Sequence, residues 1–162
     1  MNINTILIAT DFSSDSEAAL RHASALAAAE GAKLCIAHID DDTPGLVFGH
    51  VGYGYVPSVD EIAREQYDKL LTILPTNEGV TFEHRFLRGN AAESILQLAK
   101  EAKADLIVIG THGKTGLRRL LMGSVAEQVV RRAECPVLTI KQPSTGTGGE
   151  KRPLQTQPHS TE

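Results

Sequence analysis

The sequence has 162 residues, 41% of them hydrophobic and 22% charged, which is the size of one domain with an ordinary buried core. Its net charge of −4 comes from acids and bases mixed along the chain, which argues against a nucleic-acid-binding protein. No apolar run approaches the roughly 20 residues of a membrane-spanning helix, and the N-terminus lacks a signal-peptide pattern. We therefore expect a cytoplasmic protein that binds neither membranes nor nucleic acid.

Strand and helix patterns alternate along the chain. Short apolar runs rich in branched residues predict five strands, at residues 5–10, 33–39, 80–87, 105–110 and 136–140. Apolar residues at helical spacing predict four helices between them, at residues 14–30, 59–74, 93–102 and 125–133. This strict alternation predicts an α/β fold in which a parallel sheet carries helices on both faces.

A short polar residue followed three positions later by Glu stands at the predicted start of each helix. The four polar residues are Ser14, Ser58, Asn90 and Ser124. Such a side chain accepts a hydrogen bond from a backbone N–H of the first turn, while the Glu side chain reaches back. We expect these residues to cap the four helices.

Two segments depart from the economy of short connections. Residues 40–57 form a glycine-containing loop longer than the roughly 12–15 residues that structureless loops usually reach. From residue 142 onward the chain is rich in Pro, Ser, Thr, Gly and Gln, with almost no apolar side chains to compensate the entropy of ordering. We expect one domain at residues 1–141 and a disordered tail at residues 142–162.

The letters Gly113-Lys114-Thr115 suggest a nucleotide-triphosphate loop, but the first glycine of that motif would fall at Val108, inside a predicted strand. The dinucleotide fingerprint G-x-G-x-x-G is also absent. What remains is Gly110-x2-Gly113-x9-Gly123-Ser124, between the end of a buried strand and the start of a helix.

Such a loop suits an anion, because glycines allow close backbone approach and the first turn of a helix offers free N–H groups. Lys114, Arg118 and Arg119 add positive charge to it. The alternative is that the glycines only make a turn, that Ser124 only caps a helix and that the arginines face solvent.

This spacing resembles the G-2x-G-9x-G-[ST] signature of the ATP-binding members of the universal stress protein family. The resemblance runs from ILIATDFS near the start, through DLIVIGTHGKTGLRRLLMGSVAEQVVRRAECPVLTI, to about Lys141. It implies a five-stranded parallel sheet of order 3-2-1-4-5, of the Rossmann-like, adenine nucleotide alpha hydrolase-like type. Ligands of such sheets bind where the strand order reverses, beyond the carboxyl ends of the strands.

The resemblance also implies which residues contact the nucleotide. Ala9, Thr10 and Asp11 would lie along the adenosine, Ile39 would contact adenine, and Gly110, His112, Gly113, Gly123, Ser124 and Val125 would surround the ribose and phosphates. Two alternatives stay open: Asp11 could cap the first helix, a role that we expect Ser14 to fill instead, and Ile39 could be an ordinary core residue. We expect no catalytic residue and no protein metal site, with the acidic residues at 40–42 solvated.

The expected function is that of a nucleotide-dependent stress-response regulatory module. It would bind ATP, or AMP or ADP, with Mg²⁺ held mainly through the phosphates, and hydrolyse ATP or phosphorylate itself slowly at most. We expect an unidentified protein partner and a homodimer formed through the strand at 136–140, because an apolar sheet edge favours pairing. The alternatives are a genuine ATPase or phosphotransferase and a dimeric scaffold without nucleotide.

Overall fold

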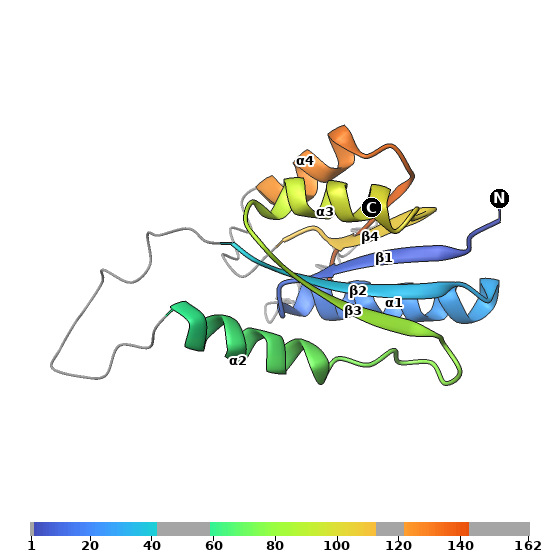
Figure 1. The fold of residues 1–162 in the computed structure, drawn as a ribbon. Helices are drawn as coiled ribbons and strands as arrows, with labels where there is room; N and C mark the ends of the chain where they lie inside the picture. The colour runs from blue at the N-terminus through green and yellow to red at the C-terminus, as the bar shows by residue number, and fades with distance from the viewer. Residues whose placement is uncertain (1, 42–58, 113–121, 143–162) are drawn as a thin grey trace, which may run out of the picture.

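The computed structural model describes residues 2–41, 59–112 and 122–142, and these ranges contain all the elements that the sequence predicts (Figure 1). In chain order they are β1 Thr5–Thr10, α1 Ser14–Glu30, β2 Lys33–Asp40, α2 Val59–Leu71, β3 Phe82–Arg88, α3 Ala91–Glu101, β4 Leu106–Gly110, α4 Ser124–Arg132 and β5 Val137–Ile140. The loop predicted at 40–57 lies outside the described residues from position 42, and the predicted tail lies outside them from position 143.

The strands form one parallel sheet in the order β3-β2-β1-β4-β5, which confirms the predicted α/β architecture. Helices α3 and α4 cover one face, and α1 and α2 cover the other (Figure 1). Leu7 and Ala9 of β1 pack toward α3 and α4, whereas Ile6 and Ile8 pack toward α1 and α2. A central strand is therefore apolar at successive positions, because neither of its faces meets water.

The strand order places the ends of β1 and β4 side by side. Ala9 of β1 pairs with Ile109 of β4 and with Ala37 of β2, so the carboxyl ends of these three strands lie side by side. From these carboxyl ends, β1 connects through α1 to β2 on one side, and β4 connects through α4 to β5 on the other. The connections diverge there, which leaves a space between them.

The helix starts differ from the expected capping pattern in two of the three places that the structure describes. Asn90 caps α3, its side chain accepting from the N–H of Glu93 at 3.0 Å, as predicted. The prediction for α1 was wrong, because Ser13 has the extended cap conformation and its hydroxyl accepts from Ser16 N–H. The prediction for α4 was also wrong, because Gly123 occupies the cap position and Ser124 is the first helical residue. Ser58 lies outside the described residues.

Helix α2 ends three residues before its predicted end. The N–H groups of Thr72 and Ile73 donate to carbonyls only three residues earlier, which tightens and closes the last turn. Leu74 precedes Pro75, and a residue before proline is disfavoured in helical conformation. The apolar pattern continues beyond the helix because Ile73 still packs against the core.

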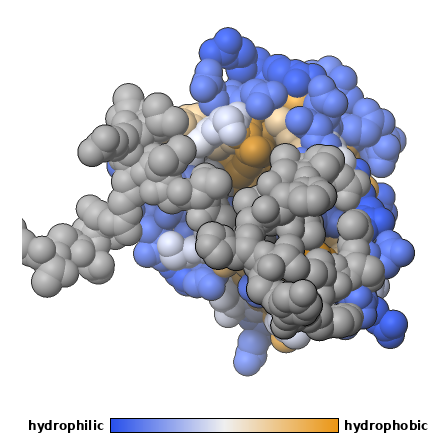
Figure 2. Space-filling model, turned by 90° about the vertical axis from the view of Figure 1, so that its left-hand side faces the viewer, coloured by the Kyte–Doolittle hydropathy of each residue, from blue (hydrophilic) through white to orange (hydrophobic). Residues whose placement is uncertain are grey.

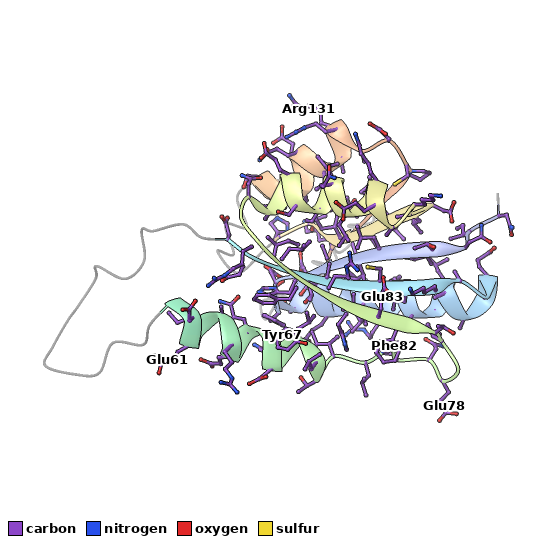
Figure 3. The ribbon with its side chains drawn as sticks, in the orientation of Figure 1. Glu61, Tyr67, Glu78, Phe82, Glu83 and Arg131 are labelled. Atoms are coloured by element: carbon purple, nitrogen blue, oxygen red, sulfur yellow. The ribbon has the colours of Figure 1, made fainter. Side chains whose placement is uncertain are left out.

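Tyr67 of α2 and Glu83 of β3, both labelled in Figure 3, make contacts at the β3 side of the sheet. Tyr67 of α2 meets the ring of Phe86 edge-on, with 5.7 Å between the ring centroids. Glu83 of β3 forms an ion pair with Lys33 of β2, with 2.6 Å between Nζ and Oε2. The Lys33–Glu83 pair lies near the start of β2, whereas Phe86 lies 5.8 Å from the ring of His38, whose Nδ1 is 2.7 Å from the carbonyl oxygen of Thr10 at the end of β1.

Two further sequence features concern the thiols and the membrane. Cys35 and Cys135 are free cysteines, and burial raises the pKa of the Cys35 thiol to about 11, so Cys35 acts as a small core side chain. No helix within the described residues is both long enough and apolar enough to span a bilayer.

The corrected cap of α1 can be tested with a pair of neighbouring substitutions. Ser13→Ala removes the acceptor for Ser16 N–H, and we expect it to lower the free energy of unfolding by about 1 kcal/mol. Ser14→Ala changes an exposed residue of the helix itself, and its effect should stay within about 0.5 kcal/mol. Urea denaturation followed by circular dichroism measures both. A larger loss for Ser14→Ala than for Ser13→Ala would contradict the assignment.

Candidate functional site

A cavity of about 160 Å³ lies at the carboxyl ends of β1, β2 and β4, bordered by the first turns of α3 and α4. It is lined by Ala9, Thr10, Asp11, Ser16, Ile39, Ala91, Ile95, Ile109, Gly110, Thr111, His112, Gly123, Ser124, Val125 and Ala126. Figure 2 looks onto this end of the molecule and shows a hydrophobic hollow among hydrophilic residues. A concave, largely apolar surface with a few polar groups is the usual form of a small-molecule site.

The structure brings together nine of the ten residues that the sequence assigns to a nucleotide site. They come from four segments: Ala9, Thr10 and Asp11 at the end of β1, Ile39 near the end of β2, Gly110 and His112 at the end of β4, and Gly123, Ser124 and Val125 at the start of α4. The tenth, Gly113, lies outside the described residues, as do Lys114, Arg118 and Arg119. Their roles toward a ligand remain predictions, but their convergence on one cavity is a property of the fold.

Asp11 also takes part in the start of α1, where only Ser14 was expected to act. Its Oδ1 accepts hydrogen bonds from the backbone N–H of Ser13, at 3.1 Å, and from the Ser13 hydroxyl. Because Ser13 is the cap of α1, Asp11 supports the helix start while its side chain also lines the cavity. The expectation that Ser14 caps α1 and that Asp11 does not contribute to the helix start was wrong.

Thr10 shapes the turn between β1 and α1. Its hydroxyl accepts from Phe12 N–H at 3.1 Å and lies 3.1 Å from the hydroxyl of Ser16. Ser16 in turn donates to the carbonyl of Ser13 at 2.8 Å. Phe12 has φ of 63°, a left-handed conformation that non-glycine residues rarely adopt. The Thr10 hydroxyl therefore holds a strained turn and is engaged within the protein.

Gly110 is required by the packing of α1 against the end of β4. A Cβ atom built at this position would lie 2.9 Å from the carbonyl carbon and the Cβ of Asp15, and 3.0 Å from Ser16 N. These distances are far below van der Waals contact, and two of the three atoms belong to the backbone of a helix. The absence of a side chain at Gly110 therefore serves helix–strand packing, independently of any ligand.

Asp15 is the main site residue that sequence reasoning missed. Its Oδ2 accepts from the Thr111 hydroxyl at 3.2 Å, from His112 N–H at 3.1 Å and from His112 Nδ1 at 3.2 Å. Its Oδ1 accepts from Gln142 N–H at 3.4 Å. The carboxylate thus ties the first turn of α1 to the segments that follow β4 and β5.

The ionisation of Asp15 follows from these bonds. Burial by itself raises the pKa of this carboxyl, but hydrogen bonds from the backbone and ring of His112, from Gln142 N–H and from Thr111 together lower the pKa below its usual value. Only 9% of the residue is exposed. Asp15 is therefore an anion held inside the protein, next to the cavity that His112 lines.

The start of α4 presents unpaired backbone donors. Gly123 donates to the carbonyl of Thr111 at 2.7 Å, and the N–H of Glu127 makes the first bond of the helix, to Gly123 O at 3.0 Å. Gly123 has no side chain with which to cap, so within the described residues the N–H groups of Ser124, Val125 and Ala126 have no acceptor. Such a helix end attracts anions through its N–H groups and its dipole.

The sequence model of the universal stress protein family matches residues 2–141. The chain belongs to the universal stress protein family. It is 38% identical over 141 residues to the universal stress protein MJ0531 of Methanocaldococcus jannaschii, in an alignment that covers 85% of this chain and 82% of that relative. The family assignment therefore covers the sheet, its helices and the cavity.

Solved structures of the family share the fold. MJ0577 of M. jannaschii, a hypothetical protein whose biochemical function was assigned from its structure, has a TM-score of 0.75 at 26% identity and covers 90% of this chain and 100% of its own. A universal stress protein solved in complex with cAMP has a TM-score of 0.58 at 31% identity, covering 86% and 98%. One from Archaeoglobus fulgidus in complex with dAMP has a TM-score of 0.61 at 27% identity, covering 87% and 100%.

The packing role of Gly110 gives a prediction. Gly110→Ala forces α1 away from the end of β4, and we expect a loss of about 1–3 kcal/mol in the free energy of unfolding. The chemical shifts of Thr111 and His112 should also change, because their acceptor Asp15 moves with the helix.

Gly31→Ala is the matched control for this substitution. It places the same methyl group in open space at φ of 68°, so it strains the backbone locally without touching this contact. It should leave the shifts of Thr111 and His112 unchanged. A Gly110→Ala variant as stable as the wild type, with unchanged shifts for both residues, would disprove the packing role.

Proposed function

We propose that this universal stress protein binds an adenine nucleotide in the cavity and acts as a nucleotide-dependent stress-response regulatory module in the cytoplasm. The observation that carries the proposal is the convergence of nine predicted residues on one cavity, next to the uncapped start of α4. The family structures in complex with cAMP and with dAMP support an adenine nucleotide as the ligand. ATP is the proposed physiological form, with AMP and ADP as alternatives.

The arrangement of the walls suggests how the nucleotide lies. Apolar side chains of Ile39, Ala91 and Ile95 offer a surface to the adenine ring. The N–H groups at the start of α4 and the hydroxyl of Ser124 suit a phosphate, because donors at a helix start bind anions without a charged side chain. We expect Mg²⁺ to arrive with ATP and to be held mainly by the phosphate oxygens and water.

A regulatory role fits the described side chains better than efficient phosphoryl transfer. That reaction needs a positioned nucleophile, a base, and groups that stabilise the negative charge of the transferred phosphoryl group. The ionisable side chains on the described cavity wall are Asp11 and His112. Asp11 already accepts two hydrogen bonds from Ser13, so its Oδ1 is engaged at the start of α1. We therefore expect slow hydrolysis at most, with an unidentified protein reading the bound state.

We also propose that the protein is a homodimer paired through β5. This strand is at the sheet edge, and the carbonyls of Pro136 and Ile140 accept from β4. Since alternate residues of a strand face opposite neighbours, the backbone groups of Val137 and Thr139 point to the open edge. An open edge of this kind pairs readily with the same strand of a second copy.

Nucleotide binding is tested by filling the cavity. Ala91→Phe puts a ring into the space proposed for adenine, and isothermal titration calorimetry with ATP and AMP should show an affinity at least about 100-fold lower than wild type. Ala102→Phe makes the same change at the other end of α3, away from the cavity, and should bind like the wild type. Equal binding by the wild type and Ala91→Phe would reject this site.

The dimer is tested at Thr139. Thr139→Pro removes an N–H that points to the open edge while the ladder between β4 and β5 keeps its bonds, so we expect monomers in light scattering after size-exclusion chromatography. Thr139→Val keeps the N–H and should keep a mass of about twice the 17.4 kDa chain, as in the wild type. A wild-type protein that elutes as a monomer would contradict the proposed assembly.

A further inference from the structure

His38 of β2 connects the end of β1 to helix α2. Its Nδ1 lies 2.7 Å from the carbonyl oxygen of Thr10, and its Nε2 lies 2.6 Å from Oε1 of Gln66 in α2. Only 3% of the residue is exposed. The next residue of the strand, Ile39, lines the cavity. One buried ring therefore joins α2 to the strand ends that form the cavity wall.

The ring makes both contacts at once. A carbonyl oxygen has only lone pairs, so Nδ1 must donate to Thr10. The amide of Gln66 has both an NH₂ group and an oxygen, so it can pair with Nε2 whether or not that nitrogen carries a hydrogen. Loss of either partner leaves a buried polar group unsatisfied, which is the costly way to break a hydrogen bond. The orientation of His38 therefore depends on Thr10 and on Gln66 together.

The turn that follows Thr10 packs against the same ring. The ring of Phe12 lies 4.3 Å from that of His38, and Nζ of Lys69 in α2 lies 4.5 Å from the centre of the Phe12 ring. The left-handed backbone of Phe12 persists only where its surroundings hold it. Thr10 and Asp11 line the cavity. The turn thus has the cavity on one side and contacts of α2 on the other.

Helix α2 lies along β2 and β3 with few buried side chains to hold it (Figure 1). Of the α2 residues whose side chains the structure describes, only Ala63 and Leu70 are buried. Elements with few buried apolar contacts open locally more often than the core does. The bond between Gln66 and His38 is therefore a substantial part of what keeps α2 in place.

We propose that His38 is a positioning residue that couples the cavity to α2. A nucleotide that orders Thr10 and Asp11 fixes the ring of His38 and, through it, Gln66, so α2 opens less often when the cavity is occupied. The inference rests on the nucleotide site proposed above and names the element that responds to its occupancy. Coupling is reciprocal: the factor by which a nucleotide disfavours the opening of α2 is the factor by which it binds more weakly when α2 is open.

This role differs from a purely structural one. If the bond between His38 and Gln66 served only the fold, its loss would lower the free energy of unfolding, and the folded protein would bind nucleotide as before. If the bond carries the coupling, its loss also weakens binding, although Gln66 does not line the cavity.

The first measurement is nucleotide affinity. Gln66→Met removes the amide and keeps a flexible side chain of similar length, which packs readily beside aromatic rings. Isothermal titration calorimetry should show an ATP affinity about fivefold lower than that of the wild type. Gln97→Met is the matched control: it removes one side-chain bond from α3, to Glu101 at 3.0 Å, away from the cavity, and should bind like the wild type.

The second measurement is hydrogen exchange of the α2 amides. Saturating ATP should slow their local exchange about fivefold in the wild type and have little effect in Gln66→Met. His38→Asn keeps an N–H as many bonds from Cα as Nδ1 is, but it does not reach Gln66, and it should behave like Gln66→Met.

Equal ATP affinity in the wild type and Gln66→Met would overturn the inference while the nucleotide site stands, whether or not His38→Asn folds. Local exchange in α2 that ATP leaves unchanged in a wild type that binds it would overturn the inference as well. A wild type that binds neither ATP nor AMP would instead overturn the proposed function, and this inference with it.

Discussion

The hydrogen bonds of Asp15 connect the parts of the molecule that form the cavity. The residue belongs to the first turn of α1, yet its partners Thr111, His112 and Gln142 follow β4 and β5. Asp15 is not itself among the lining residues. The shape of the cavity therefore depends on a buried anion behind its wall, and removing that anion would leave several donors without an acceptor.

The fold was predictable because each level of the sequence agrees with the next. Strands that are covered on both faces must be apolar at successive positions, and β1 and β4 are. The order 3-2-1-4-5 came from the family resemblance, since alternation alone does not determine it. The cap of α1 was misassigned because Ser13 and Ser14 are adjacent and only Ser14 is followed three residues later by Glu, at position 17. The structure instead gives the extended cap conformation to Ser13, which the sequence pattern does not reveal.

The sequence predicted which residues form the candidate site, but it did not predict the contacts that place them there. Parallel strands end at one edge, so segments from β1, β2 and β4 had to meet there. The reason for a glycine at 110 could not be predicted, because the atoms that exclude a side chain belong to Asp15 and Ser16 in α1. Asp15 itself was missed for the same reason: an acid in the first turn of a helix suggests only a favourable interaction with the helix dipole.

Two helix starts border the cavity, and the difference between them favours one orientation of the proposed nucleotide. At α3 the side chain of Asn90 already accepts from the first turn, so that end has less to gain from an anion. At α4, Gly123 has no side chain that could cap the helix, and its own N–H donates to the carbonyl of Thr111. A phosphate of the proposed nucleotide would therefore be stabilised more at α4, and its base would then lie toward Ile39 and Ala91. In that orientation His112, which lines the cavity beside the start of α4, would lie at the phosphate end.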